Sequence, residues 1–376
     1  MGEGYLPRSH LPSGGGTVRS VVPITAEFQS ESALHPAARA ALSAIFERGW
    51  ADPSKIHPES RRTAILLEEA KQTFSTHLGV RSDEIHFLSD VGIGFHLGIA
   101  GLVHHSETRF IHSAVDRQEI FAQSHHLALS GHKTEVLPVS SHGQIEVIEL
   151  DPNSVLAWQL GNGETGIVQK QSPPPSRLFV DATASGTQIA LPGKWQSALW
   201  DSRSWFGPSG LAILAISHSS SWRNPLPHLD PRKVSDSFSI PLVLASAIAL
   251  EHWAKAREEN SHRLKAMKNQ IIDFVSRNIS DVDFASERDE GLAHLLSFSF
   301  LYVDAERLTT DLSARGFSVD SGSACTSLNL QPSHVLAAMG KLTHGNIRLY
   351  LRTEVTDEAL NAFLFALQEV VETQRR

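Results

Sequence analysis

Near the start of the chain, two stretches carry hydrophobic residues at the spacing of one helix face. The first spans residues 35–50 (HPAARAALSAIFERGW), and the second spans residues 59–80 (ESRRTAILLEEAKQTFSTHLGV) and closes on Gly79. Hydrophobic residues that recur every three or four positions line one side of an α-helix, and glycine commonly ends one. We therefore predict two amphipathic helices.

The region between residues 84 and 217 alternates short apolar runs with helical stretches. In chain order they are EIHFLS (84–89), GIGFHLGIAGLV (92–103), RFIHSAV (109–115), a polar helix, KTEVLPV (133–139), SVLAWQL (154–160), RLFVDA (177–182) and LAILAIS (211–217). Such a rhythm is typical of an α/β fold in which helices cover a mostly parallel sheet.

The pattern changes after residue 217. Residues 220–236 are proline-rich and aperiodic, and residues 241–278 have helical periodicity. The remainder predicts a small α+β unit. Its expected elements are a strand at 295–303, a helix at 304–316, a strand at 317–325, a short helix near residue 333, a strand at 346–352 and a helix at 356–374.

These changes divide the chain into three parts. Residues 1–20 are rich in Gly, Pro and Ser and lack an apolar pattern, so we expect a flexible tail. Residues 21–240 are predicted to form a large domain. Residues 241–376 are predicted to form a connecting helix and a small C-terminal domain.

Charge and composition narrow the classes of partner. The chain has 33 Lys plus Arg against 41 Asp plus Glu, a net charge of -8, which argues against nucleic-acid and anionic-membrane binding. No apolar run reaches the ~20 residues that span a bilayer, and the N-terminal sequence MGEGYLPRSHLPSGGG lacks the hydrophobic core of a signal peptide. We expect a cytoplasmic protein.

Cys325 is the only cysteine of the chain. A single thiol excludes an internal disulfide, and without a second cysteine nearby we expect no structural zinc and no other metal site. Cys325 lies in a Gly/Ser-rich segment, where a neighbouring cation would lower its pKa and make the thiol nucleophilic.

The sequence around Cys325 resembles the catalytic-cysteine loop of cysteine desulfurases, in which SSGSACS leads to EPSHVL on a helix. Four further segments follow the order of the same family. The matching segments are VDSGSACTSLNLQPSHVLAAMG (319–340), ADPSKIHPESRRT (51–63), NGETGIVQ (162–169), VDA (180–182) and FGPSGLAIL (206–214). The chain is similar to the cysteine desulfurase and class V aminotransferase family along nearly its whole length.

This resemblance implies a fold, a cofactor and a reaction. The fold would be that of fold-type I pyridoxal phosphate enzymes, with a mostly parallel seven-stranded sheet and a small C-terminal domain. The protein would be a homodimer with pyridoxal 5′-phosphate at the domain junction. The thiol of Cys325 would take sulfur from cysteine, and Arg348 would bind the substrate carboxylate.

The position of the family's cofactor lysine is altered. Family members carry SAHKxxGPKG, and counting back from Gly207 without a gap places Ser204 at the lysine and Arg203 at the preceding histidine. A serine hydroxyl cannot form an imine with the cofactor aldehyde. Lys194 and Lys233 lie nearby in sequence and are alternative sources of an amine.

The resemblance also assigns the groups around the cofactor ring. Asp181 matches the aspartate that pairs with the pyridine nitrogen, and Asn162 belongs to the matching NGETGIVQ segment. Arg117 stands where the family has the histidine that stacks on the ring. Ala184 replaces the glutamine that contacts the phenolic oxygen.

The phosphate site differs in the same way. The family's GATEANN reads DVGIGFH at residues 90–96, so that Gly92 replaces the threonine and Asp90 replaces a glycine. A carboxylate repels a phosphate, although amides at a helix start attract one. Ser237 matches the threonine that reaches this site from the other subunit.

Three hypotheses follow for the activity. In the first, the family fold is retained without conventional pyridoxal phosphate chemistry, and the protein relays sulfur through Cys325 or partners an active desulfurase. In the second, the protein is an active pyridoxal phosphate enzyme that uses a displaced lysine. In the third, the cleft binds another small molecule as a scaffold or sensor. The sulfur acceptor or substrate stays open in each.

Overall fold

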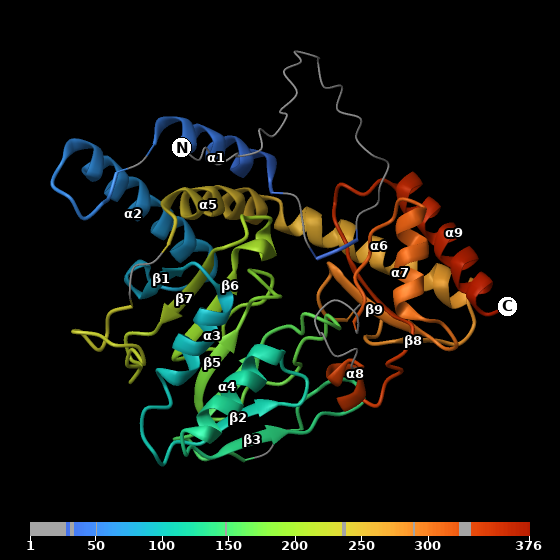
Figure 1. The fold of residues 1–376 in the computed structure, drawn as a ribbon, viewed down its shortest axis with the longest axis horizontal. Coiled ribbons are helices and arrows are strands. Elements are labelled where there is room, and N and C mark those ends of the chain that lie inside the picture. Colours follow the sequence, from blue (N-terminus) through green and yellow to red (C-terminus); the bar gives the residue numbers. More distant parts are fainter. Residues whose placement is uncertain are drawn as a thin grey trace, which may run out of the picture.

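The structure is a computed structural model that describes residues 28–30, 34–49, 51–146, 149–234, 238–288, 290–322 and 332–376. Three predictions therefore lie outside the described residues: the tail at 1–20, Ser237 and Cys325. Figure 1 shows a larger part built around a seven-stranded sheet and a smaller part that carries the chain's C-terminus.

Helices occupy much of the described chain (Figure 1). They are α1 (Pro36–Arg48), α2 (Pro58–Leu78), α3 (Val91–Ala100), α4 (Gln118–Leu129), α5 (Ile240–Lys255), α6 (Arg257–Asn278), α7 (Ala305–Ala314), α8 (His334–Ala338) and α9 (Asp357–Gln374), with short 3₁₀ helices η1 (Ser82–Glu84) and η2 (Ser202–Trp205). Among the described residues, no helix is both long and apolar enough to cross a lipid bilayer.

The strands form two sheets. Their bounds are β1 (Ile85–Leu88), β2 (Phe110–Ser113), β3 (Thr134–Leu137), β4 (Val155–Gln159), β5 (Arg177–Asp181), β6 (Ser197–Asp201), β7 (Ala212–Ile216), β8 (Val282–Phe284), β9 (Leu295–Phe300) and β10 (Asn346–Tyr350). The larger sheet has seven strands in the order β1-β7-β6-β5-β4-β2-β3. Its strands are parallel except β7, which runs antiparallel to both β1 and β6.

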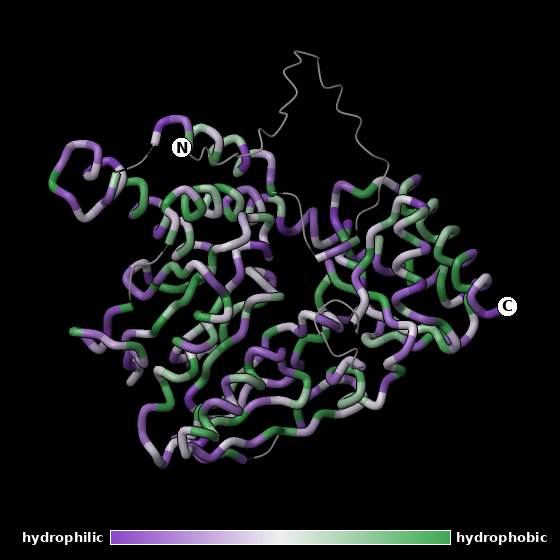
Figure 2. Tube along the Cα trace, viewed as in Figure 1, coloured by the Kyte–Doolittle hydropathy of each residue, from purple (hydrophilic) through white to green (hydrophobic). Residues whose placement is uncertain are grey.

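Helices cover both faces of the seven-stranded sheet. Alternate residues of a strand point to opposite faces, and Ile213 of β7 belongs to the core beneath α2 and α5, whereas Leu214 belongs to the core beneath α3 and α4. Figure 2 shows hydrophobic residues along these strands, as expected for strands buried on both faces. The first core continues into the smaller part through Phe298 and Phe363.

The smaller part is built on an antiparallel sheet of three strands in the order β10-β9-β8. A segment from near the N-terminus packs against it. Phe28 is fully buried, its ring centroid lies 4.4 Å from that of Phe363, and its carbonyl accepts from the backbone N–H of Tyr350 (2.8 Å). Residues 28–30 thus lie beside the C-terminal part of the chain.

The predicted fold class is confirmed by the seven-stranded, mostly parallel sheet and the small C-terminal α+β unit. Both N-terminal helices lie close to their predicted bounds, and α2 ends at Gly79 in the left-handed conformation (φ 70°, ψ 32°). The domain boundary at residue 240 stays a prediction.

Two strand predictions differ from the structure. Strand β6 was not predicted, because the polar residues Ser197 and Asp201 bound its short apolar stretch; it nevertheless lies buried between β5 and β7. The strand expected at 317–325 is not regular where it is described. It forms only single bridges, from Val319 to Phe28 and from Asp320 to Arg348.

Two glycines allow α3 to pack closely. A Cβ atom at Gly98 would lie 2.5 Å from the ring of Phe179, and one at Gly101 would lie 2.0 Å from Nε1 of Trp222. Trp222 is fully buried, and its Nε1–H donates to the carbonyl of Leu97 (2.7 Å). A side chain at Gly101 would therefore displace this indole.

We predict that Gly101→Ala lowers the free energy of unfolding by about 2 kcal/mol, because the methyl group overpacks the core and displaces the Trp222 hydrogen bond. Urea unfolding followed by circular dichroism measures the change. Gly193→Ala is the matched control, since no atom lies within 4 Å of the added methyl group. Equal stabilities of the two variants would refute the packing argument.

Candidate functional site

A cavity of about 870 Å³ opens at the carboxyl ends of three neighbouring parallel strands. Gln159 ends β4, Asp181 ends β5 and Asp201 ends β6, and all three line the cavity. Residues from the smaller part close its other side, among them Arg348 and Tyr350 of β10. We call this cavity the cleft.

The structure brings most of the predicted site residues into the cleft. Those that line it are Arg117, Asn162, Asp181, Arg203, Ser204 and Arg348. Gly92 is not among the residues that line it. Cys325 and Ser237 lie outside the described residues, but Gly322 and Pro332, the nearest described residues on either side of Cys325 along the chain, both line the cleft.

Asp181 is buried and linked to Arg117 through Thr183. Its Oδ1 accepts from the backbone N–H (2.9 Å) and the hydroxyl (2.6 Å) of Thr183, and that hydroxyl accepts from Nη1 of Arg117 (2.7 Å). Burial raises the pKa of the Asp181 carboxyl, and Arg117 acts in the opposite direction. Because Thr183 stands between them, the two charges are connected by a hydrogen-bonded chain.

Arg117 is held by further contacts at the start of α4. Its Nε and Nη2 each donate to the carboxylate of Glu119 at 3.0 Å, and its Cζ lies 5.1 Å from the ring centroid of Phe95. Burial opposes its charge, but Asp181 and Glu119 raise the pKa of the guanidinium above its ordinary value. With these partners, Arg117 is fixed in one orientation.

Asp201 organises the neighbouring turn η2. Its carboxylate accepts from the backbone N–H of Arg203 (2.9 Å) and from that residue's Nε (2.9 Å) and Nη2 (2.6 Å). These hydrogen bonds raise the pKa of the Arg203 guanidinium. The hydroxyl of Ser204 donates to the carbonyl of Asp201 (2.7 Å), so Ser204 is tied to the strand end.

Arg348 and Tyr350 share one face of β10. The Cζ of Arg348 lies 5.6 Å from the Tyr350 ring centroid, and the Tyr350 hydroxyl donates to the carbonyl of Gly163 (2.9 Å). Nη2 of Arg348 lies 3.5 Å from Oδ2 of Asp320, and its buried Nε has no hydrogen-bond partner among the described residues. Arg348 therefore brings a guanidinium to the wall of the cleft.

Several functional groups of the cleft were not predicted from the sequence. Tyr350 could have been found from the sequence, because its two-residue spacing from Arg348 on a strand places both side chains on the same face. Glu164 accepts a hydrogen bond from the Ser333 hydroxyl, and burial raises the pKa of its carboxyl. Burial lowers the pKa of His294 to about 4, so this imidazole is neutral at pH 7.

Comparisons with known proteins agree with this architecture. No family model matches the chain. The cysteine desulfurase IscS of Dictyoglomus turgidum is 26% identical over 359 residues, covering 89% of this chain and 91% of the relative. A solved NifS-like protein has a TM-score of 0.81 at 18% identity, and the NifS-like protein of Rickettsia africae has 0.78 at 16%. These two cover 92% of this chain and 99% of each structure.

This is the fold of the cysteine desulfurase and class V aminotransferase family. Cysteine desulfurases use pyridoxal 5′-phosphate, which is therefore the expected cofactor. That cofactor needs an amine, a phosphate cradle and groups that face the ring.

An amine is missing from the described cleft. No lysine is among the residues that line it. Lys194 and Lys233, the predicted alternatives, are exposed and lie outside the cleft. All lysines of the chain lie in described regions, namely Lys55, Lys71, Lys133, Lys170, Lys194, Lys233, Lys255, Lys265, Lys268 and Lys341. Within one chain, Ser204 therefore has no substitute amine along the cleft wall.

The start of α3, where the cysteine desulfurase phosphate would lie, is occupied by a carboxylate. Asp90 is the N-cap of this helix, and its Oδ1 accepts from the backbone N–H of Ile93 (3.0 Å). A Cβ at Gly92 would lie 2.9 Å from the same oxygen. An incoming phosphate would meet a negative charge and compete for an amide that is already engaged.

The side chain of Asn162 is fully hydrogen-bonded within the chain. Its amide nitrogen donates to the carbonyl of Val115 (2.8 Å) and to Gln159 (2.9 Å). Its amide oxygen accepts from Glu164 N–H (2.9 Å) and Thr165 N–H (2.8 Å). With both ends engaged, Asn162 shapes the turn and has little hydrogen-bonding capacity left for a ligand.

A buried pair lies behind the cleft wall of this cysteine desulfurase fold. The cleft residue His334 contacts the Asp116 carbonyl through Nε2 (2.8 Å). His112 is fully buried, and burial lowers its pKa to about 4. Burial also raises the pKa of Asp116 well above its ordinary value. His112 is therefore uncharged near neutral pH.

The pKa of His112 predicts a loss of stability in acid. Its folded-state pKa of about 4 lies below the ordinary 6.5, so between these pH values the unfolded chain binds a proton that the folded chain does not. We expect this residue to remove about 2 kcal/mol of stability between pH 7 and pH 5. Urea unfolding at both pH values measures it.

The difference between wild type and His112→Phe isolates this group, because the phenyl ring keeps the packing and cannot titrate. The variant should lose less stability on acidification than the wild type. His125→Phe, on an exposed position of α4, is the matched control and should follow the wild type. Parallel pH profiles of His112→Phe and the wild type would contradict the assignment.

Proposed function

We propose that this protein retains the cysteine desulfurase fold without conventional pyridoxal phosphate turnover, and that it relays sulfur through Cys325. One observation carries the proposal. Ser204 lies in the cleft wall where the resemblance expects the lysine, its hydroxyl is bonded to the Asp201 carbonyl, and no lysine lines the cleft. Without an amine in reach, the cofactor aldehyde has no covalent partner.

The other groups of the cleft support the same interpretation. Arg117 and Arg203 are engaged by Glu119 and Asp201, and Asp90 occupies the amide end of α3. These interactions neutralise Arg117 and Arg203 within the chain. The residues present therefore do not fit a covalently held pyridoxal phosphate, and we derive no step of a reaction through it.

A sulfur relay needs only a thiolate and a donor persulfide. The thiolate of Cys325 would attack the outer sulfur of a persulfide, forming a new S–S bond, while the donor's S–S bond breaks and the donor leaves as a thiolate. The step is balanced without an external oxidant. Gly322 and Pro332, which flank this segment, line the cleft, and Arg348 supplies a cation there.

We further propose that the chain acts as a homodimer in the cytoplasm, with a large domain at 21–240 and a small one at 241–376. Ser237 would face the partner's cleft, as its likeness to the family threonine implies. The similarity to relatives named cysteine desulfurases extends over most of the chain.

Absorption spectroscopy tests the loss of the covalent cofactor link. Purified wild-type protein mixed with pyridoxal phosphate should show no absorption band at about 420 nm, where a protonated Schiff base absorbs. Ser204→Lys should gain that band and lose it on borohydride reduction. A borohydride-sensitive band in the wild type would overturn the proposal.

Ser209→Lys is the matched control for the spectrum. Ser209 is exposed and does not line the cleft, so its lysine adds an amine of the same chemistry outside the site. The control should stay colourless under the same conditions. If it coloured as strongly as Ser204→Lys, the band would report surface labelling, and the special role of position 204 would be rejected.

Mass spectrometry tests the sulfur relay. Incubation with glutathione persulfide should add the mass of one sulfur atom, about 32 Da, to the peptide that contains Cys325. A reductant should remove it, and Cys325→Ser should gain nothing. An unmodified Cys325 peptide, with the persulfide still intact at the end of the incubation, would exclude the relay.

A further inference from the structure

One carboxylate, that of Glu164, touches the chain on both sides of the segment that contains Cys325. Residues 323–331 lie outside the described residues, whereas Gly322 before them and Ser333 after them are described. Oε1 of Glu164 accepts a hydrogen bond from the Ser333 hydroxyl, and a Cβ atom on Gly322 would lie 3.0 Å from the same oxygen. Gly322 and Ser333 therefore lie side by side at the wall of the cleft, which both of them line.

The loop after β4 holds Glu164 in place. Its backbone N–H donates to Oδ1 of Asn162 (2.9 Å), and the N–H of Gly166 donates to the Asn162 carbonyl (2.9 Å). The hydroxyl of Tyr350 donates to the carbonyl of Gly163 (2.9 Å), which ties the same loop to β10. The carboxylate of Glu164 is thus carried by a loop that is fixed at several points.

Ser333 anchors the chain where it resumes after the Cys325 segment. It is the N-cap of α8, and its Oγ accepts from the backbone N–H of Leu336 (3.1 Å) while its proton goes to Glu164. Helix α8 also packs into a small apolar cluster through Val335 and Met339. The hydrogen bond from Glu164 therefore reaches a well-packed element.

Gly322 anchors the chain before the Cys325 segment. Its N–H donates to Oδ1 of Asn346 (3.1 Å). Asn346 is fully buried, and its amide nitrogen donates to the hydroxyls of Ser297 and Ser299, both at 3.1 Å. A Cβ atom on Gly322 would lie 2.4 Å from Oδ1 of Asn346, so this position accepts only glycine. The backbone at Gly322 is held between Asn346 and Glu164.

We propose that Glu164 is a positioning residue for the Cys325 thiol. By joining the two flanks at the cleft wall, it confines the thiol to the neighbourhood of the cleft and raises its effective concentration there. Cys325 is three residues from Gly322, and three residues extend over about 10 Å at most. The inference rests on the proposed function, because this is the thiol that relays sulfur.

Disulfide trapping in the full-length protein measures that effective concentration. Ala184 lines the cleft, and a Cβ atom on Gly163, the neighbour of Glu164, would lie 3.5 Å from its Cβ. Cys325 is the only cysteine, so Ala184→Cys creates a single possible pair within the chain. In a glutathione buffer the two thiols form one disulfide, while oxidised glutathione takes up their protons and electrons and becomes two reduced molecules. Mass spectrometry of dilute protein gives the ratio of the two forms.

Substitutions in this Ala184→Cys background test Glu164 itself. Glu164→Leu cannot accept from Ser333 and should lower the effective concentration about 5- to 20-fold. Ser333→Ala removes the donor and should lower it similarly. Glu164→Gln keeps an acceptor oxygen and should stay within about 3-fold of the parent. Glu69→Leu, at an exposed position of α2, is the matched control and should leave the value unchanged.

Several outcomes would overturn the positioning role. One is the absence of a disulfide in the parent, and another is an equal value in Glu164→Leu and the parent. A loss in Glu164→Gln as large as that in Glu164→Leu would also reject it. A purely structural role would lower the melting temperature of Glu164→Leu and Ser333→Ala without changing the effective concentration.

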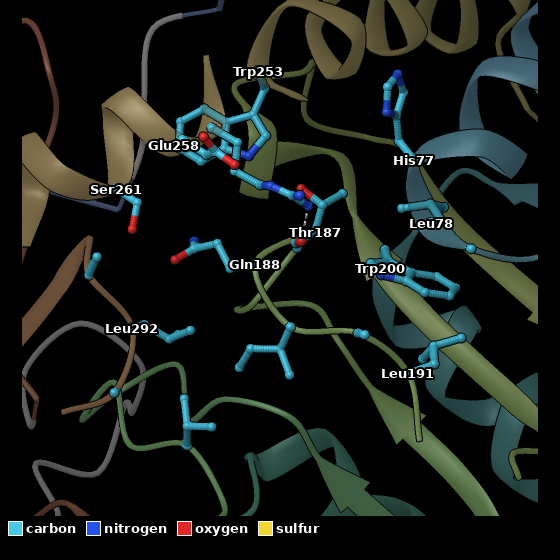
Figure 3. Close-up of a pocket in the computed structure, with 18 of the residues that line it drawn as sticks. His77, Leu78, Thr187, Gln188, Leu191, Trp200, Trp253, Glu258, Ser261 and Leu292 are labelled. Carbon is cyan, nitrogen blue, oxygen red and sulfur yellow. Dashed lines mark hydrogen bonds between the residues drawn. The ribbon is translucent and has the colours of Figure 1, made fainter. Parts of the chain in front are cut away.

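A thiol placed in another cavity is the control for position 184. This second cavity, of about 1030 Å³, lies between the end of α2, the loop at 186–193 and the junction of α5 and α6 (Figure 3). Ala190 is exposed and lines it but not the cleft. Ala190→Cys should pair with Cys325 at least about 10-fold less favourably than Ala184→Cys. Equal pairing at both positions would show that the thiol is not confined to the cleft.

The disulfide assay contains no persulfide, so it separates this inference from the sulfur relay. A protein that takes no sulfur from glutathione persulfide but shows the dependence on Glu164 would lose the relay and keep the positioning role. A protein that takes up sulfur at Cys325, with pairing that is independent of Glu164, would lose the positioning role alone.

Discussion

Charges at the carboxyl edge of the sheet must be paired because they are removed from water. Asp181 and Asp201 end adjacent strands and are almost fully buried. Asp201 is paired with Arg203, and Asp181 reaches Arg117 through Thr183. A buried charge without a partner is strongly destabilising. This requirement fixes the turn after β6, the start of α4 and the shape of the cleft between them.

Much of the fold could be predicted because its signals are local. The sequence pattern placed the end of α2 at Gly79 and the start of the last helix at Thr356, which caps α9 by accepting from the Ala359 N–H. Strand β6 could not be predicted from its own sequence, since its burial comes from its place between β5 and β7. The bridge of Val319 to Phe28 joins segments far apart in sequence, so no local pattern indicated it.

The site was predictable as a set of positions but not as a network. The resemblance to the family picked out Asp181, Ser204 and Arg348 as site residues, and all three line one cleft. It did not reveal that the Asn162 side chain is fully hydrogen-bonded within the chain, or that Asp90 accepts from the Ile93 N–H, because both depend on side-chain orientation.

The pairing of Arg117 and Arg203 within the chain has a consequence for folding. Enzymes that leave charges for a vitamin-derived group to neutralise gain stability when that group binds. Here Glu119 and Asp201 already neutralise Arg117 and Arg203. The folded cleft therefore needs no bound ligand to neutralise these two guanidinium groups.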